Sequence, residues 1–262
     1  MFCLRLASLA FFVFFCSACQ GESTLQNPVT LTLTLSHLLK DPDPDVRQTA
    51  ALSLGKIAHP SGIPGLKEAL KDHDARVREY SAWAIGEIGE LVDDATIIGV
   101  VATLGDLEPS VQRASALALG RLPPNQSVID ALGEALSVGR VSSRQATVDA
   151  LMHLASPRAY PSLVEVLQDP DPAVRQGAVA ALGEWGDPQV LPDLRKRLLY
   201  DSAEGVRTEA AFRLGKLGGK EDLSVLQKAA DRDPTAMVHL WSVWAIEHIT
   251  EDTSTPPQPG AP

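Results

Sequence analysis

Histidine and cysteine, the residues that most often hold a metal ion or act as nucleophile and base, form no catalytic pattern in this chain. No two histidines have the helical spacing of a zinc motif. All three cysteines lie within the first 19 residues, so the rest of the chain has no thiol. There is no Gly-x-Ser-x-Gly turn and no phosphate loop. We therefore expect no catalytic residue, no metal and no cofactor. The histidines are His37, His59, His73, His153, His239 and His248.

The charged residues exclude two classes of partner. The chain has 33 Asp and Glu against 23 Lys and Arg, which gives a net charge of −10. Binding to a nucleic-acid backbone needs clustered basic residues, so we expect no nucleic-acid partner. Adsorption to an anionic membrane by charge alone is excluded for the same reason. Most carboxylates stand at turns, where they cap helices, and an acid pair for catalysis is not expected.

One phrase of seventeen residues recurs along the chain. It reads DPDPAVRQGAVAALGEW at 169–185 and DPDPDVRQTAALSLGKI at 41–57. Successive copies of its central valine are separated by 31, 34, 32, 31, 32 and 32 residues. A fixed period between 20 and 50 residues is typical of a solenoid. Seven copies fill residues 29–250, anchored at Val46, Val77, Val111, Ser143, Val174, Val206 and Val238.

Each repeat predicts two helices joined by a turn that usually contains aspartate. Apolar or small residues recur 4, 8 and 11 positions after the anchor, as at Ala50, Leu54 and Ile57, and this spacing forms one stripe of a helix. An amphipathic segment such as 63–71, 160–168 or 190–199 precedes the turn. A pair of helices cannot bury both stripes alone, but stacked pairs can. Residues 31–35 alternate like a strand, but they align with the first helix, so we predict helix there. A glycine nine positions after the anchor either allows close approach of stacked helices or ends the helix.

The phrase D-x4-V-R-x2-A-x3-L-G resembles HEAT repeats, of the short type found in phycobilin lyases and bacterial scaffolds. The resemblance covers about 220 of 262 residues and implies an all-α solenoid. It also implies a hydrogen-bonded ladder of Asp and Arg along the stack. Three copies depart from the pattern, with Gln112, Val138 and His239 at ladder positions. The implied ladder residues are Asp41 with Arg47, Asp72 with Arg78, Asp169 with Arg175, and Asp201 with Arg207.

Two enzyme families resemble this fold. Deoxyhypusine hydroxylases bind iron through His-Glu dipeptides at repeated positions, but this chain has no such dipeptide, and Glu247-His248 has the reverse order. Phycobilin lyases share the structural phrase itself, which says little about bilin chemistry.

The first residues resemble a bacterial export signal. Residues 1–18 combine one positive charge with a short apolar run, and Cys16-Ser17-Ala18-Cys19 resembles a lipobox. We expect lipidation at Cys19, residues 19–28 as a tether, and a membrane anchor in the bacterial envelope. Gln20 favours the periplasmic face of the outer membrane over the inner membrane. The alternative is ordinary cleavage after Ala18, which leaves a free thiol. Residues 251–262 are rich in proline and are expected to be disordered.

A partner surface is predicted on the second helices, if they line the concave side of the array. Rings beside charges are typical of binding hot spots. The alternative is that the rings only cover neighbouring helices, and that Trp241 and Trp244 cap the last repeat. The fourth repeat, with Met152 in place of glycine, is a plausible bend. The candidate ridge consists of Tyr80, Trp83, Leu117, Phe212 and Trp244.

These observations together predict a monomeric, lipid-anchored scaffold that binds another protein and is not an enzyme. Two other functions stay open. One is a lyase-like or other enzyme that handles a small molecule. The other is a purely structural array with an empty concave face.

Overall fold

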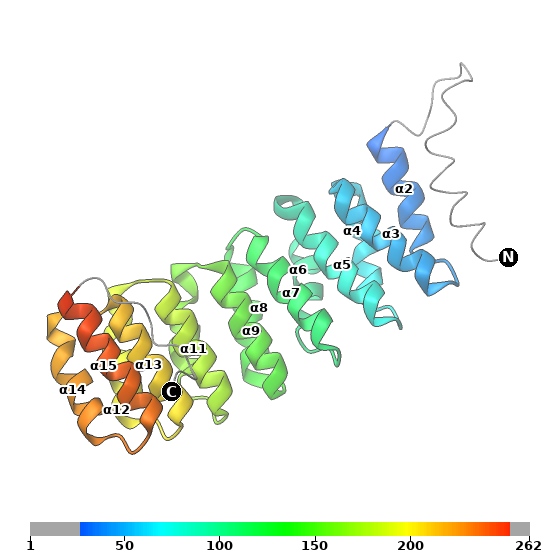
Figure 1. The fold of residues 1–262 in the computed structure, drawn as a ribbon. Helices are drawn as coiled ribbons and strands as arrows, with labels where there is room; N and C mark the ends of the chain where they lie inside the picture. Colours follow the sequence, from blue (N-terminus) through cyan, green and yellow to red (C-terminus); the bar gives the residue numbers. More distant parts are fainter. Residues whose placement is uncertain (1–26, 252–262) are drawn as a thin grey trace.

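The computed structural model describes residues 27–251, apart from the side chains of residues 90, 138 and 251, and this part is an all-α solenoid (Figure 1). Its fourteen α-helices form seven consecutive pairs, which confirms the predicted fold class. The first members, called A-helices below, are α2 (Pro28–Leu38), α4 (Ile63–Ala69), α6 (Asp94–Thr103), α8 (Gln126–Val138), α10 (Tyr160–Val166), α12 (Leu191–Tyr200) and α14 (Leu223–Arg232). The second members, called B-helices, are α3 (Pro44–Ile57), α5 (Ala75–Ile88), α7 (Pro109–Arg121), α9 (Val141–Leu154), α11 (Pro172–Glu184), α13 (Glu204–Leu217) and α15 (Ala236–Glu251).

Short 3-10 turns precede or follow several of these helices. They connect α3 to α4, α5 to α6, and three of the later B-helices to the next A-helix, so most repeats join through a tight turn and not through a long loop. These turns are η2 (Pro60–Gly62), η3 (Gly89–Leu91), η4 (Pro157–Ala159), η5 (Pro188–Val190) and η6 (Lys220–Asp222).

The aspartates of the repeated turn start the B-helices. Asp43, Asp74 and Asp171 each occupy the N-cap, and their carboxylates accept hydrogen bonds from amides two or three residues further on. A proline at the first helical position follows two of them, where its missing N–H costs nothing. The alternating segment 31–35 lies in α2, where the hydroxyl of Thr32 donates to the carbonyl oxygen of Pro28 at 2.6 Å.

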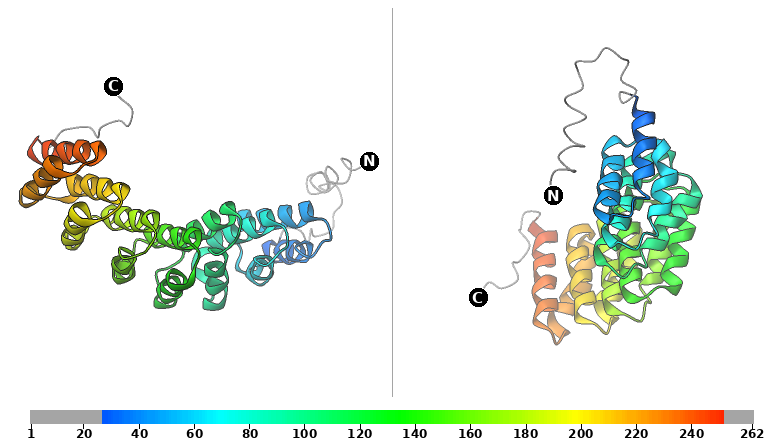
Figure 2. Two further views of the ribbon diagram at one scale, coloured as in Figure 1. Left: turned by 90° about the horizontal axis from the view of Figure 1, so that it is seen from below. Right: turned by 90° about the vertical axis from the view of Figure 1, so that its right-hand side faces the viewer.

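The core is a continuous ribbon between the two layers. Leu54, Leu119 and Leu182, from three B-helices, are all buried within one apolar cluster that runs from Leu39 to Ala245. Consecutive B-helices pack closely, whereas consecutive A-helices touch far less. The array therefore curves toward the B-helices, which form the inner layer of the arc in Figure 2.

The repeated glycine serves close approach between B-helices. Gly86 and Gly120 lie in the last turn of α5 and α7 but still within the helix. A Cβ atom added to Gly86 would lie 2.7 Å from the Cα atom of Ala118 on α7, so no side chain fits there. Positive φ angles after B-helices occur at other residues, Ala58, Gly89, Ala155 and Gly186.

The predicted leader, the lipidation site Cys19 and most of the tether lie outside the described residues, as does nearly all of the predicted tail. Lipid anchoring and envelope localisation therefore stay predictions. Within residues 27–251, no helix combines the length and the apolar character needed to cross a membrane.

Candidate functional site

Five arginines near the start of B-helices connect neighbouring repeats at five of the six junctions in the described array, and we call them and their partners the Arg–Asp ladder. Arg47 shows the pattern: Nε and Nη2 donate to the carboxylate of Asp72 in the next repeat at 2.7 and 2.8 Å. Its Nη1 donates to the carbonyl oxygen of Asp41 in its own repeat at 2.8 Å. The guanidinium fork fits both carboxylate oxygens at once. The other pairs are Arg78–Asp106, Arg144–Asp169, Arg175–Asp201 and Arg207–Asp233.

The ladder is interrupted between the third and fourth repeats. Gln112 takes the place of arginine there, and its amide donates to the carbonyl oxygen of Asp106 at 2.7 Å and to the hydroxyl of Ser142 at 3.3 Å. The fourth repeat resumes the ladder through Arg144, which donates to the carbonyl oxygen of Gly139 at 2.8 Å. Arg144 was not predicted as a ladder residue, although it follows the anchor Ser143 as arginine follows the valine in most other repeats.

Hydrogen bonds hold the ladder aspartates in their charged form. Burial by itself raises the pKa of the Asp72 carboxyl. Hydrogen bonds from Arg47 and from the amide of Asp74 lower this pKa by more than burial raises it, so it lies below the ordinary value. The same balance applies to the other four carboxyl groups, those of Asp106, Asp169, Asp201 and Asp233.

Acid is expected to destabilise the fold through this ladder. A carboxyl whose pKa is lower in the folded than in the unfolded chain stabilises the fold fully above the unfolded pKa and loses that contribution as the pH falls through the folded pKa. We therefore expect the urea midpoint to hold steady near neutral pH and to drop below about pH 4. Urea titrations between pH 7 and pH 2.5 measure this. Asp233→Asn should flatten the drop, and a midpoint independent of pH would contradict the ladder's role.

Four of the predicted ridge residues lie on the inner face. Tyr80, Trp83 and Phe212 are half-buried, and Leu117 is 47% exposed. The ring of Trp83 covers Gly55 of the preceding B-helix, because a Cβ atom added there would lie 2.8 Å from its Cε3 atom. These side chains thus pack on neighbouring helices and also leave surface for a partner.

The fifth ridge residue, Trp244, is not accessible in this structure. Only 4% of its surface is exposed, and its ring lies 5.5 Å from the rings of Phe212 and Trp241 and 4.9 Å from that of His248. A Cβ atom added to Gly215 of α13 would lie 2.7 Å from the Cζ3 atom of Trp244. Trp244 therefore packs on the preceding B-helix and offers little contact surface to a partner.

The centre of the inner face carries a carboxylate and an imidazole, and not the Trp and Phe side chains found elsewhere on this face. Asp149 and His153 lie one turn apart on α9, and both are exposed. Neighbouring charges are already paired, Arg121 with Glu87 and Glu184 with Arg213. Asp149 forms no hydrogen bond or ion pair with any described residue. Loss of water around it raises the pKa of its carboxyl, and the nearby His153 opposes that rise.

Metal ligands do not gather anywhere in the described part of the chain. Among residues 27–251, no group of three or more His, Cys, Asp or Glu side chains is placed to hold an ion. The donors on the inner face, Asp149 and His153, are two groups on one helix, and the charged neighbours on adjacent helices are held in ion pairs.

Comparison with known proteins places this geometry in a family. A family model described as HEAT repeats matches residues 32–98, 98–171 and 160–247. The chain belongs to the HEAT-repeat family. This bears out the resemblance read from the repeated phrase.

Curated HEAT-repeat relatives correct the functional expectation. Deoxyhypusine hydroxylase of Drosophila melanogaster is 28% identical over 228 residues, which cover 82% of this chain and 68% of the relative. The same enzyme of Drosophila pseudoobscura pseudoobscura is 27% identical over 225 residues, covering 81% and 68%. The expectation of a scaffold that is not an enzyme is therefore wrong. It rested on the absence of local motifs, but a site on a repeat scaffold can combine side chains from separate repeats that no motif reveals.

Two solved structures are also similar to this chain. Human deoxyhypusine hydroxylase in complex with glycerol aligns with a TM-score of 0.42 at 21% identity, covering 86% of this chain and 97% of that one. The complex of CpcE and CpcF of phycocyanin lyase from Nostoc sp. PCC7120 aligns with a TM-score of 0.46 at 21% identity, covering 90% and 92%.

Proposed function

We propose that this HEAT-repeat protein is an enzyme that modifies a cationic side chain of another protein, which it binds at Asp149 and His153 on the inner face. The similarity to deoxyhypusine hydroxylases over 82% of the chain supports the enzymatic class. The position of the pair supports this site. Asp149 and His153 lie on α9, in the fourth of the seven repeats, and the B-helices form the concave side of the array.

The chemistry of the pair suits this role. Asp149 is a carboxylate without a partner among the described residues, and the surrounding protein raises the pKa of its carboxyl. A substrate ammonium beside Asp149 would supply the counter-charge that the described residues do not. His153, one turn away, has ring nitrogens that can donate or accept a hydrogen bond and so move a proton on the bound amine.

The surroundings of the pair favour a protein substrate. Leu117 projects from α7 beside it and is 47% exposed, and the half-buried rings of Trp83 and Phe212 lie further along the same face. Partly exposed apolar side chains around a charged centre are what protein partners bind. The net charge of −10 attracts a basic partner.

Iron chemistry of the kind that the resemblance implies does not fit these residues. The chain has no His-Glu dipeptide, and the described residues provide no set of three ligands. We therefore derive no step through a metal, and we assign to Asp149 and His153 only the binding of the substrate amine and the movement of its proton.

Mass spectrometry of a protein substrate tests the proposal. The full chain is incubated with a protein that bears deoxyhypusine and with the same protein carrying unmodified lysine, each with and without added Fe(II). We expect a change in the mass of one of the two substrates. Because general acid–base groups contribute roughly 10²–10⁴ in rate, Asp149→Asn and His153→Gln should each slow the reaction at least tenfold.

Gln145→Ala is the matched control, since Gln145 lies one turn before Asp149 on the same helix. It should leave the rate within about twofold if the pair and not the face in general is responsible. A product that forms only with added iron would contradict the exclusion of a metal at this site. No change in the mass of either substrate would contradict the enzymatic function.

A further inference from the structure

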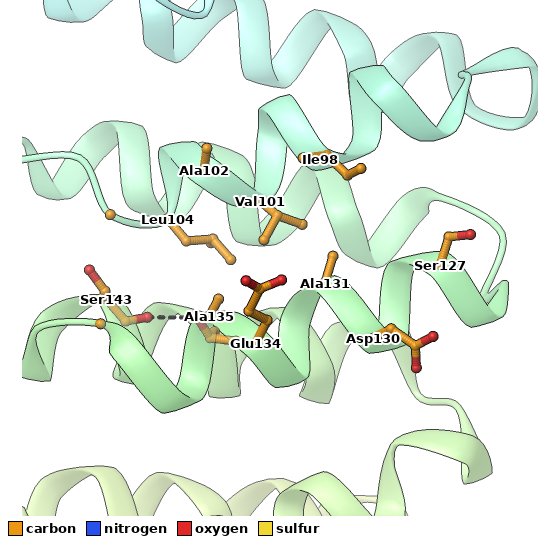
Figure 3. A pocket seen from close by; sticks show the side chains of 13 residues that line it. Ile98, Val101, Ala102, Leu104, Ser127, Asp130, Ala131, Glu134, Ala135 and Ser143 are labelled. Carbon is orange, nitrogen blue, oxygen red and sulfur yellow. Dashed lines mark hydrogen bonds between the residues drawn. The ribbon is translucent and has the colours of Figure 1, made fainter.

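A cleft opens in the outer layer where the Arg–Asp ladder is interrupted. It lies between α6 and α8, reaches the start of α9, and has a volume of about 550 Å³ (Figure 3). Gln112 bridges this junction through single hydrogen bonds and not through a guanidinium fork. Small-molecule sites commonly have volumes of about 300–1,000 Å³, so the cleft is large enough for a small ligand.

The walls of the cleft are apolar. Val101 comes from α6 and Leu104 from its C-cap, and Ala131 and Ala135 come from α8 opposite them (Figure 3). Ile98 also lines the cleft, with 56% of its surface exposed. Burying these walls would favour an aliphatic ligand, at about 25 cal/mol for each Å² removed from water.

One carboxylate in the cleft has no partner among the described residues. Glu134 extends from α8 over the apolar walls, and its side chain forms no hydrogen bond or ion pair (Figure 3). The neighbouring carboxylates are engaged: Asp130 accepts from Gln126 at 2.7 Å, and Asp94 accepts from Ser127 at 3.1 Å. The lining residues include no lysine or arginine. The charge of the cleft is thus complementary to a cation at Glu134.

A serine hydroxyl lies at one end of the cleft (Figure 3). Ser143 as a whole is 5% exposed, it lines the cleft, and its hydroxyl forms no hydrogen bond with a described residue. Gly105 faces it, because a Cβ atom added there would lie 3.7 Å from the Oγ atom of Ser143. Polar groups of largely buried residues are normally satisfied, so this hydroxyl is placed to bind a polar ligand atom.

We infer that this cleft binds a linear aliphatic diamine, with one ammonium at Glu134, the alkyl chain along the walls from α6 and α8, and the second amine at Ser143. This site lies on the outer layer, away from Asp149 and His153 on the inner face. It stands whether or not that pair is catalytic.

Calorimetric titration of the full chain tests the inference with three probes of equal chain length: 1,6-diaminohexane, hexylamine and 1-hexanol. We expect saturable binding in the order diamine, then amine, with the alcohol weakest. Glu134→Gln should weaken the diamine at least tenfold. Ser143→Ala should weaken the diamine but leave hexylamine within about twofold, because only the diamine has a second polar end.

Asp130→Asn is the control, because this carboxylate lines the same cleft but already accepts a hydrogen bond. It should weaken the diamine less than threefold. Ala131→Leu fills the cleft from an accessible position and should abolish binding while the melting temperature is retained. The inference is overturned if the diamine gives no saturable heat, if Glu134→Gln binds it as well as the wild type, or if 1-hexanol binds equally well.

Discussion

Asp201→Ala is expected to lower the free energy of unfolding by about 3–5 kcal/mol, the typical cost of removing one partner from a buried ion pair. The Asp201 carboxylate accepts from Arg175 at 2.9 and 2.7 Å and from Arg197 at 3.2 Å, and its side chain is 1% exposed. Both arginines are 9% exposed. The substitution would leave two guanidinium groups facing each other without a counter-ion in a position that water hardly reaches.

Urea unfolding monitored by circular dichroism measures this loss. Glu87→Ala is the control, because Glu87 also pairs with an arginine of a neighbouring repeat, Arg121, but both side chains are far more exposed. An exposed pair contributes at most about 1 kcal/mol, so the control should lose no more than that. Equal losses in the two variants would show that burial does not set the strength of the ladder.

Gly86→Ala is expected to destabilise the protein by about 1–3 kcal/mol, although alanine favours helix by about 1 kcal/mol over glycine. The added Cβ atom would lie 2.7 Å from the Cα atom and 2.8 Å from the Cβ atom of Ala118. A backbone atom cannot move aside by changing rotamer. Helices α5 and α7 would therefore have to separate, and the core beneath them would lose packing.

Gly133→Ala supplies the matched control within α8. Its nearest neighbour would be the Oγ atom of Ser162 at 3.7 Å, which is an ordinary contact distance. We expect this variant to gain about 0.5–1 kcal/mol from helix propensity alone. If the repeated glycine serves close approach, thermal and urea unfolding will show Gly86→Ala to be less stable than the wild type and Gly133→Ala to be more stable. A more stable Gly86→Ala variant would contradict it.

Only part of the candidate site could be predicted from the sequence. The row that contains Asp149 and His153 follows from helical spacing, but nothing in the sequence shows that Asp149 is left without a partner while Arg121 and Glu184 are paired. The exclusion of an enzyme was wrong because it treated missing motifs as missing chemistry. The cleft at Glu134 also had no signal beyond the irregular fourth repeat.

The sequence by itself determined the pairs of helices, their period and their starts. Apolar stripes repeat within a turn or two of helix, and a capping aspartate such as Asp43 bonds an amide two residues away, so these features depend on local interactions. Tertiary structure alone decided that Arg47 bonds Asp72, 25 residues further on, and that no such bond spans the junction at Gln112. These contacts depend on the distance between neighbouring repeats, which is set by packing in the core and not by any one segment.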